Sequence, residues 1–145
     1  MATMKEQLPP VASAIVTNER AEVLVVERTK QDIAEDGSVL KCSFPGGGVE
    51  PDETALQGVV RETLEETGYL VEPTEVLFAG RHPLFPIHMT YVACKLIAHL
   101  NPDTRDSGVK NVLWVPIADL PTTFTTPIHE AIAEHLGLNE LHLPK

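Results

Sequence analysis

The feature that most constrains this chain is a run of three glycines, at positions 46 to 48, followed by an acidic turn and a helix-forming segment. The turn leads into a capping box in which Thr54 is the N-cap and Gln57 is the third helical residue. Gly68 suits the position just after a helix end, where a left-handed backbone favours glycine. The pattern predicts a glycine-rich loop feeding a helix over Ala55 to Thr67.

The predicted helix divides into an apolar and an acidic side. At about 100° per residue, one side gathers six residues that we expect to be buried: Leu56, Val59, Val60, Thr63, Leu64 and Thr67. Glu62, Glu65 and Glu66 lie on roughly the opposite side. Like charges one helical turn apart repel each other, so this arrangement gains from a cation between them. An all-oxygen ligand set favours Mg²⁺ or Mn²⁺ over zinc.

The segment from Gly47 to Tyr69 resembles the signature of the Nudix hydrolases, G-x(5)-E-x(7)-R-E-U-x-E-E-x-G-U, where U is apolar. Every fixed position is matched, by Gly47, Glu53, Arg61, Glu62, Glu65, Glu66 and Gly68. The resemblance extends through Phe44-Pro45-Gly46 on one side and Trp114-Val115-Pro116 on the other. Two U positions depart from the pattern, because Thr63 is not aliphatic and Tyr69 is aromatic.

The resemblance implies a role for each matched residue. Glu62, Glu65 and Glu66 would bind Mg²⁺, for which Mn²⁺ can substitute, and the carbonyl of Gly46 would be a further ligand. Glu62 or Glu65 would also accept the proton of the attacking water. Glu53 and Arg61 are interpreted as a structural pair, since a planar guanidinium can hold a carboxylate through two hydrogen bonds. Gly58, on the same face as Glu62, is expected to leave space beside metal and phosphate.

Composition narrows the class of protein. The chain has 145 residues, of which 43% are hydrophobic and 22% charged, as expected for one globular domain with a core. We predict a single domain over residues 1–145, with 1–10 and 138–145 as peripheral tails. The formal charge of −10 argues against a nucleic-acid polymer as partner. No apolar run reaches membrane length, and Cys42 and Cys94 are expected to be buried thiols, so the predicted location is cytoplasmic.

The remaining elements complete the predicted fold. Strands are expected at 11–17, 23–27, 40–44, 76–79, 87–97 and 112–115, and a closing helix at 127–136, with Thr126 as its N-cap and Gly137 after its end. Residues 29–38 and 101–110 are expected to be polar loops. Strands on both sides of a central helix suggest a mixed sheet between helices. This agrees with the α/β/α sandwich that the Nudix resemblance implies.

The sequence offers four candidates for substrate contacts. Arg28 and Arg81 end strand-like segments and are candidates to meet phosphate, and Phe85 and Phe124 are candidates to stack on a base. The six histidines show no metal-site spacing and are interpreted as surface or core residues. Many Nudix proteins carry an acid in the loop before the Trp-Val-Pro strand. Here Lys110 lies near that place, and Asp103 or Asp106 could substitute.

Two kinds of function remain open. The preferred hypothesis is a pyrophosphohydrolase of the MutT-like kind, which splits a nucleoside triphosphate into a monophosphate and pyrophosphate. The alternative substrate is ADP-ribose or a nucleotide sugar, since Pro83 lies 15 residues after Gly68, near where the ADP-ribose-cleaving group tends to carry a proline. A different class is a non-catalytic nucleotide sensor, which ranks lower because all the signature glutamates are present. The sequence leaves the number of metal ions and the oligomeric state open.

Overall fold

The computed structural model describes residues 7–100 and 108–138. Its elements follow in the order β1 (Pro10–Val16), β2 (Glu22–Ile33), β3 (Val39–Ser43), β4 (Gly46–Gly48), α1 (Ala55–Thr67), β5 (Tyr69–Arg81), β6 (His88–His99), β7 (Val109–Pro116), α2 (Leu120–Thr123) and α3 (Glu130–Leu136). A short 3₁₀ turn, Ile117–Asp119, joins β7 to α2. No helix within the described residues has the length and apolar composition needed to cross a membrane.

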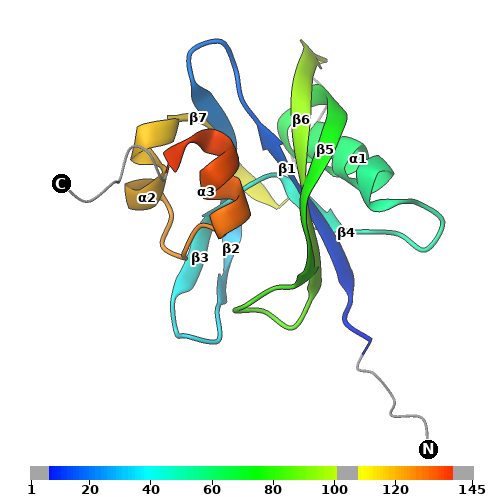
Figure 1. Ribbon diagram of the computed structural model, residues 1–145, viewed down its shortest axis with the longest axis vertical. Helices are drawn as coiled ribbons and strands as arrows, with labels where there is room; N and C mark the ends of the chain where they lie inside the picture. The colour runs from blue at the N-terminus through cyan, green and yellow to red at the C-terminus, as the bar shows by residue number, and fades with distance from the viewer. Residues whose placement is uncertain (1–6, 101–107, 139–145) are drawn as a thin grey trace, which may run out of the picture.

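The strands form two sheets. One has the order β4-β1-β6-β5 and is mixed, because β1 runs parallel to β6 while β4 and β5 are antiparallel to their neighbours. The other has the order β3-β2-β7 and is antiparallel. Helix α1 lies on one side of the strands, and α2 and α3 lie on the other (Figure 1). The expected mixed sheet between helices is therefore confirmed, although the strands separate into two sheets.

Strand β1 is buried on both faces, and this places it at the centre of the molecule. Ala12, Ala14 and Val16 face the helix α1 side and pack with Val59. Ile15 faces the other side, where Leu120 and Ile132 bring α2 and α3 onto the core. A strand covered on both faces reads as a continuous apolar run, as this one does. The small side chains on the α1 face let the helix approach the sheet closely.

Helix α1 has the predicted bounds and the predicted caps. The Thr54 side chain accepts a hydrogen bond from the Gln57 amide, and the Gln57 side chain accepts one from the Thr54 amide. Gly68 ends the helix in the left-handed conformation, at φ 81°. The predicted buried face is wrong in part, because Leu56 is 40% exposed while Glu66 is only 9% exposed.

Three strand and helix predictions are corrected by the structure. Strand β2 continues through the segment 29–33, which we expected to be a loop, because it pairs with β3 there beyond a bulge. Strand β5 begins directly after α1 at Tyr69 rather than at Val76, and Pro73 is tolerated because β5 lies at a sheet edge. The closing helix begins at Glu130 with His129 as its N-cap, not at 127 with Thr126.

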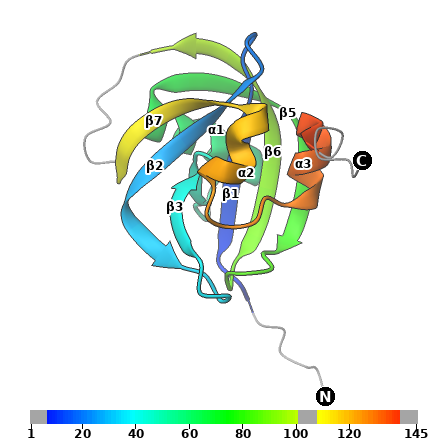
Figure 2. The same cartoon turned by 90° about the vertical axis from the view of Figure 1, so that its left-hand side faces the viewer.

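Smaller differences concern the ends of elements. Helix α2 was not predicted, whereas Gly137 closes α3 with φ 75°, as expected. Leu138, placed at the start of a peripheral tail, is 3% exposed and packs in the core. Cys42 and Cys94 are buried free thiols, as predicted. Strands β2, β3 and β7 curve around one side of the molecule, where α2 contacts β7, whereas α3 contacts β5 (Figure 2).

Candidate active site

Arg61 is the centre of the hydrogen-bond network that joins the glycine strand β4 to helix α1. Its Nε and Nη2 atoms donate to the two carboxylate oxygens of Glu53, at 3.1 and 2.7 Å. Nη2 also donates to the carbonyl oxygen of Gly48, at 3.2 Å. The expected pair of Glu53 and Arg61 is thus present, with both carboxylate oxygens engaged. It ties the turn before the helix to the middle of the helix and to the end of β4.

Each member of this pair shifts the pKa of the other in the direction that favours the charged form. The Arg61 hydrogen bonds, together with the Glu50 amide, hold the pKa of Glu53 below its usual value. The Glu53 carboxylate correspondingly raises the pKa of Arg61, so the guanidinium is charged throughout the physiological range. Both groups therefore stay ionised, and the pair is a fixed geometric feature of the site rather than a proton carrier.

Glu66 turns inward from the helix toward the glycine strand. Its Oε1 accepts a hydrogen bond from the Gly46 amide at 2.8 Å, and the residue is 9% exposed. Burial raises the pKa of Glu66 to about 7, the Gly46 hydrogen bond acts against that rise, and the nearby charge of Glu62 adds to it. The positive charge of the Arg28 guanidinium lowers the pKa of Glu66, as the Gly46 hydrogen bond does. A buried carboxylate with a single backbone donor is a group whose charge a cation would stabilise.

Glu62 and Glu65 face the guanidinium of Arg61. Arg61 Nη1 lies 3.0 Å from Glu62 Oε1 and 3.3 Å from Glu65 Oε2. The Glu62 side chain is 18% exposed, and its burial raises its pKa against the opposing effect of Arg61. Glu65 is 56% exposed. The three glutamates thus run from a buried to a solvent-exposed position along one side of α1.

Gly47 is required by the close approach of Glu62. A Cβ atom at Gly47 would lie 2.8 Å from both Cδ and Oε1 of Glu62. At Gly46 a Cβ atom would lie 2.7 Å from the Ser13 Cα atom of β1, and closer still to the Ala12 carbonyl oxygen. The glycine strand therefore has no side chains where the sheet and the acidic helix meet.

Glu62, Glu65 and Glu66 offer the carboxylate oxygens that a hard divalent cation binds, but in this structure their side chains do not converge. Within residues 7–100 and 108–138, no three acidic, histidine or cysteine side chains converge on one point. The reason is visible in the contacts, because Glu62 and Glu65 turn to Arg61 while Glu66 turns to the Gly46 amide. The donors are nevertheless carboxylate oxygens on successive turns of one helix, which is the ligand type that Mg²⁺ prefers.

The interpretation of Gly58 changes with the structure. We expected its missing side chain to leave space beside metal and phosphate. A Cβ atom at Gly58 would instead lie 3.0 Å from Glu53 Oε1 and 3.6 Å from Val49 Cγ2. The small residue therefore makes room for the Glu53 carboxylate, which in turn holds Arg61.

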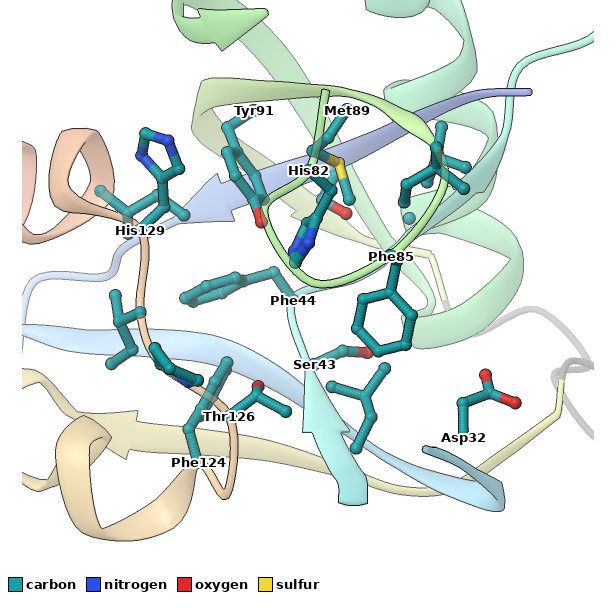
Figure 3. A pocket seen from close by; sticks show the side chains of 18 of the residues that line it. Asp32, Ser43, Phe44, His82, Phe85, Met89, Tyr91, Phe124, Thr126 and His129 are labelled. Carbon is teal, nitrogen blue, oxygen red and sulfur yellow. The ribbon is translucent and has the colours of Figure 1, made fainter. Parts of the chain in front are cut away.

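A cavity of about 340 Å³ opens beside the glycine strand. Gly46 and Gly47 form part of its wall, so the cavity borders the strand that contacts Glu62 and Glu66. Much of the remaining lining is aromatic, as Figure 3 shows: Phe44, His82, Phe85, Tyr91, Phe124 and His129. The rings of Phe44 and Phe124 pack together, with centroids 4.8 Å apart. A cavity with a mostly apolar lining and several polar side chains among it is the usual form of a small-molecule site.

Three of the four predicted substrate residues line this cavity, and the fourth does not. Arg28, Phe85 and Phe124 contribute to the wall. Arg28 is held by Asp32, whose Oδ2 lies 3.1 Å from Nη2. Arg81 is absent from the lining; it pairs with Glu35 at 3.4 Å and donates to the His82 carbonyl oxygen. Arg81 as a substrate contact therefore stays a prediction that this cavity does not include.

Other lining residues had no recognisable signal in the sequence. Ser43, Tyr91 and Thr126 reach the cavity from two strands and a loop, and only the fold brings them together. His82 and His129 were interpreted as ordinary histidines, yet both line the cavity. Lys110 lies on β7, whereas Asp103 and Asp106 fall outside the described residues.

Comparison with known proteins identifies the family. The NUDIX domain family model matches residues 7–136. A candidate 8-oxo-dGTP diphosphatase of Bacillus subtilis is 41% identical over 112 residues, which are 76% of this chain and 68% of that protein. The 8-oxo-dGDP phosphatase NUDT18 of Mus musculus is 30% identical over 113 residues, 77% of this chain but only 33% of that protein.

Solved structures agree on the fold. A NUDIX hydrolase from Nitrosomonas europaea superimposes with a TM-score of 0.71 at 22% identity, covering 90% of each chain. The family-model match takes in the glycine strand, the acidic helix and nearly all of the described residues. This chain belongs to the NUDIX domain family.

Proposed function

We propose that this protein is a metal-dependent pyrophosphohydrolase that cleaves a nucleoside triphosphate to a nucleoside monophosphate and pyrophosphate. The observation that carries the proposal is the position of the aromatic cavity, whose wall includes Gly46 and Gly47. A base held among the aromatic rings would direct its phosphates along the glycine strand toward Glu62 and Glu66. The names of the relatives, an 8-oxo-dGTP diphosphatase and an 8-oxo-dGDP phosphatase, support a nucleotide substrate.

Each part of the site has a role in this reaction. Arg28, at the cavity wall and close enough to influence Glu66, would bind a substrate phosphate. Arg61 and Glu53 would fix the glycine strand against the helix. Glu62 or Glu65 would accept the proton of the attacking water. A bound Mg²⁺, held by Glu62, Glu65 and Glu66 with the Gly46 carbonyl, would neutralise phosphate charge and lower the pKa of that water.

A nucleoside triphosphate is preferred over ADP-ribose because the Bacillus subtilis relative is named for a nucleoside triphosphate, 8-oxo-dGTP. The non-catalytic sensor is disfavoured because the signature glutamates that hydrolysis would need, Glu62, Glu65 and Glu66, are all present.

A substrate panel with Mg²⁺ tests the proposal. It includes canonical and oxidised nucleoside triphosphates, ADP-ribose, nucleotide sugars and dinucleoside polyphosphates, with products identified by chromatography. We expect pyrophosphate and a monophosphate from at least one triphosphate. Phosphate and a diphosphate as products would refute the cleavage position. Preferential hydrolysis of ADP-ribose would instead support the alternative function, an ADP-ribose pyrophosphatase. Binding without turnover would indicate a sensor.

A further inference from the structure

The loop between β5 and β6 holds one histidine ring in a fixed orientation at the cavity wall. The His82 amide donates to the Ile87 carbonyl at 2.9 Å, and the Ile87 amide donates to the Phe85 carbonyl at 2.8 Å. Pro83 and Pro86 restrict the backbone between these bonds. The Leu84 amide donates to Nδ1 of His82 at 3.0 Å. The imidazole is therefore held by its own loop, without any ligand.

This hydrogen bond determines which ring nitrogen carries the proton. Because Nδ1 of His82 accepts from an N–H group, a neutral imidazole must carry its proton on Nε2. Burial, followed by the nearby charges of His129 and Arg81, lowers the pKa of His82, whereas Glu35 acts in the opposite direction. The ring extends into the cavity between Phe44 and Phe85, as Figure 3 shows. Nε2–H is thus a hydrogen-bond donor available to whatever occupies the cavity.

Two neighbouring polar groups do not provide the same selectivity. Tyr91 also faces the cavity, but a hydroxyl can donate or accept and so discriminates poorly. His129 has its Nδ1 bound by the Ala131 amide at 3.0 Å, yet its ring packs on Phe78 with centroids 4.2 Å apart. His82 packs instead on Phe85 of its own loop, with centroids 5.2 Å apart, and its Nδ1 hydrogen bond fixes the direction of its Nε2–H donor.

We propose that His82 is a specificity-determining residue that selects a 6-oxopurine over a 6-aminopurine through its Nε2–H group. The proposal rests on the nucleotide-hydrolase function proposed above. The two kinds of purine share the N7 acceptor and differ at position 6, where an oxo group accepts and an amino group donates, and at the adjacent N1, which donates in the 6-oxopurine and accepts in the 6-aminopurine. An oxo group would pair with Nε2–H. An amino group would set a donor against a donor, and the unpaired buried groups would weaken binding.

Two variants remove the Nε2–H donor of His82, one while keeping a hydrogen bond within the loop and the other while keeping an aromatic ring. In His82→Asn the side-chain oxygen can accept from the amide two residues on, as asparagine does in an Asx-turn, so the Leu84 bond has a substitute while Nε2–H is lost. In His82→Phe the ring and its edge contact with Phe85 are retained, while both nitrogens are lost. The matched control is His88→Asn, because His88 is exposed at the start of β6 and does not line the cavity.

The measurement is calorimetric binding of dIMP and dAMP, which differ at position 6 of the base, supported by kcat/KM for dITP and dATP. Wild type and His88→Asn are expected to prefer the oxo nucleotide by about tenfold, the worth of one hydrogen bond with a penalty for mispairing. Both His82 variants should lose this preference, chiefly through weaker dIMP binding. Thermal melting verifies that each variant is folded.

The outcomes separate this assignment from the proposed function. If either folded His82 variant keeps the preference, or if the wild type binds dIMP and dAMP equally, the His82 assignment is wrong while the nucleotide-hydrolase proposal stands. If wild type binds neither nucleotide and hydrolyses neither dITP nor dATP, the His82 assignment fails, whereas the proposed function fails only if no triphosphate of the substrate panel is hydrolysed.

Discussion

The two neighbouring glycines of β4 allow a sharp test of how the acidic helix is positioned. Replacing Gly47 by alanine would place a Cβ atom 2.8 Å from Cδ of Glu62, whereas a Cβ atom at Gly48 meets nothing within 4 Å. Neither glycine has a positive φ within the described chain, so backbone strain does not distinguish them. The pair Gly47→Ala and Gly48→Ala therefore differs in one respect, the contact with a proposed catalytic carboxylate.

The size of the effect follows from that distance. Carbon atoms in contact prefer about 3.5–4.0 Å, so the Glu62 carboxylate must retreat by roughly 0.7 Å or more. A displacement of about 1 Å in an active site can reduce turnover by about 10²-fold. We expect kcat/KM of Gly47→Ala to fall by about 10²-fold, which corresponds to about 2.7 kcal/mol of transition-state stabilisation.

Stability should respond differently from activity. The atoms that obstruct alanine at position 47 belong to the end of a flexible side chain, which can move aside. Alanine also restricts the unfolded chain, a gain of about 0.4–1 kcal/mol where its conformation is allowed. We therefore expect the free energy of unfolding of Gly47→Ala to stay within about 1 kcal/mol of wild type, and Gly48→Ala to be as active as wild type.

Gly46→Ala serves as the contrasting variant. Its Cβ atom would meet the backbone of β1, at the Ser13 Cα atom and the Ala12 carbonyl, and a central strand cannot retreat. We expect a loss of stability at the upper end of the about 1–3 kcal/mol seen for overpacking, together with a loss of activity. Hydrolysis at saturating Mg²⁺ and urea unfolding measure the two properties. Equal losses of activity in Gly47→Ala and Gly48→Ala, or full activity in folded Gly47→Ala, would refute the reasoning.

Three further expectations concern the acidic helix and the loop before β7. Turnover should require Mg²⁺ or Mn²⁺, and undiminished activity in excess EDTA, with metal content verified, would contradict the carboxylate ligand set. Glu62→Gln and Glu66→Gln should each reduce turnover by at least about 10²-fold without lowering the melting temperature of the metal-free protein; a folded variant with wild-type turnover would exclude that residue from the site. Arg61→Ala should lower both turnover and melting temperature, because Glu53, the Gly48 carbonyl and Glu62 all lose their hydrogen-bond donor. Additive effects in a double-mutant cycle of Arg61 and Glu53 would mean that the pair does not interact. Asp103→Asn and Asp106→Asn should each change turnover by less than about tenfold, and a fall of about 10²-fold or more in either would identify that residue as the missing loop acid.

Helix α1 could be predicted from the sequence because its signals are local. The capping box joins Thr54 and Gln57, three residues apart, and Gly68 ends the helix through its own backbone conformation. The pair of Glu53 and Arg61 also lies within one stretch of chain, since Glu53 directly precedes the N-cap and Arg61 lies about two turns into the helix. Signals of this range require no knowledge of the fold.

The extended strands could not be predicted in this way because their partners are distant. Residues 29–33 of β2 are mostly polar and exposed, and they form a strand because β3 pairs with them beyond a bulge. The polar start of β5 is a strand because β6 lies alongside it. The cavity depends on the same long-range pairing, which brings Phe44 of the chain before β4 against Phe124 of the chain after α2.

The position of Glu66 shows why a helical-wheel argument failed at the site. The wheel assigns a face to the core by its apolar side chains, and it placed the glutamates roughly opposite that face. That reasoning assumes that the partner surface also has side chains, which would keep a carboxylate away from the sheet. Here the partner is the glycine strand, so the backbone amide of Gly46 approaches Glu66 to 2.8 Å and the carboxylate becomes buried. The glycines of β4 and the glutamates of α1 therefore form one structural feature, because neither group would be favourable at its position without the other. Their combination places a buried carboxyl group, held by a backbone amide, next to a ligand-sized cavity, and the proposal of a cation site rests on this arrangement.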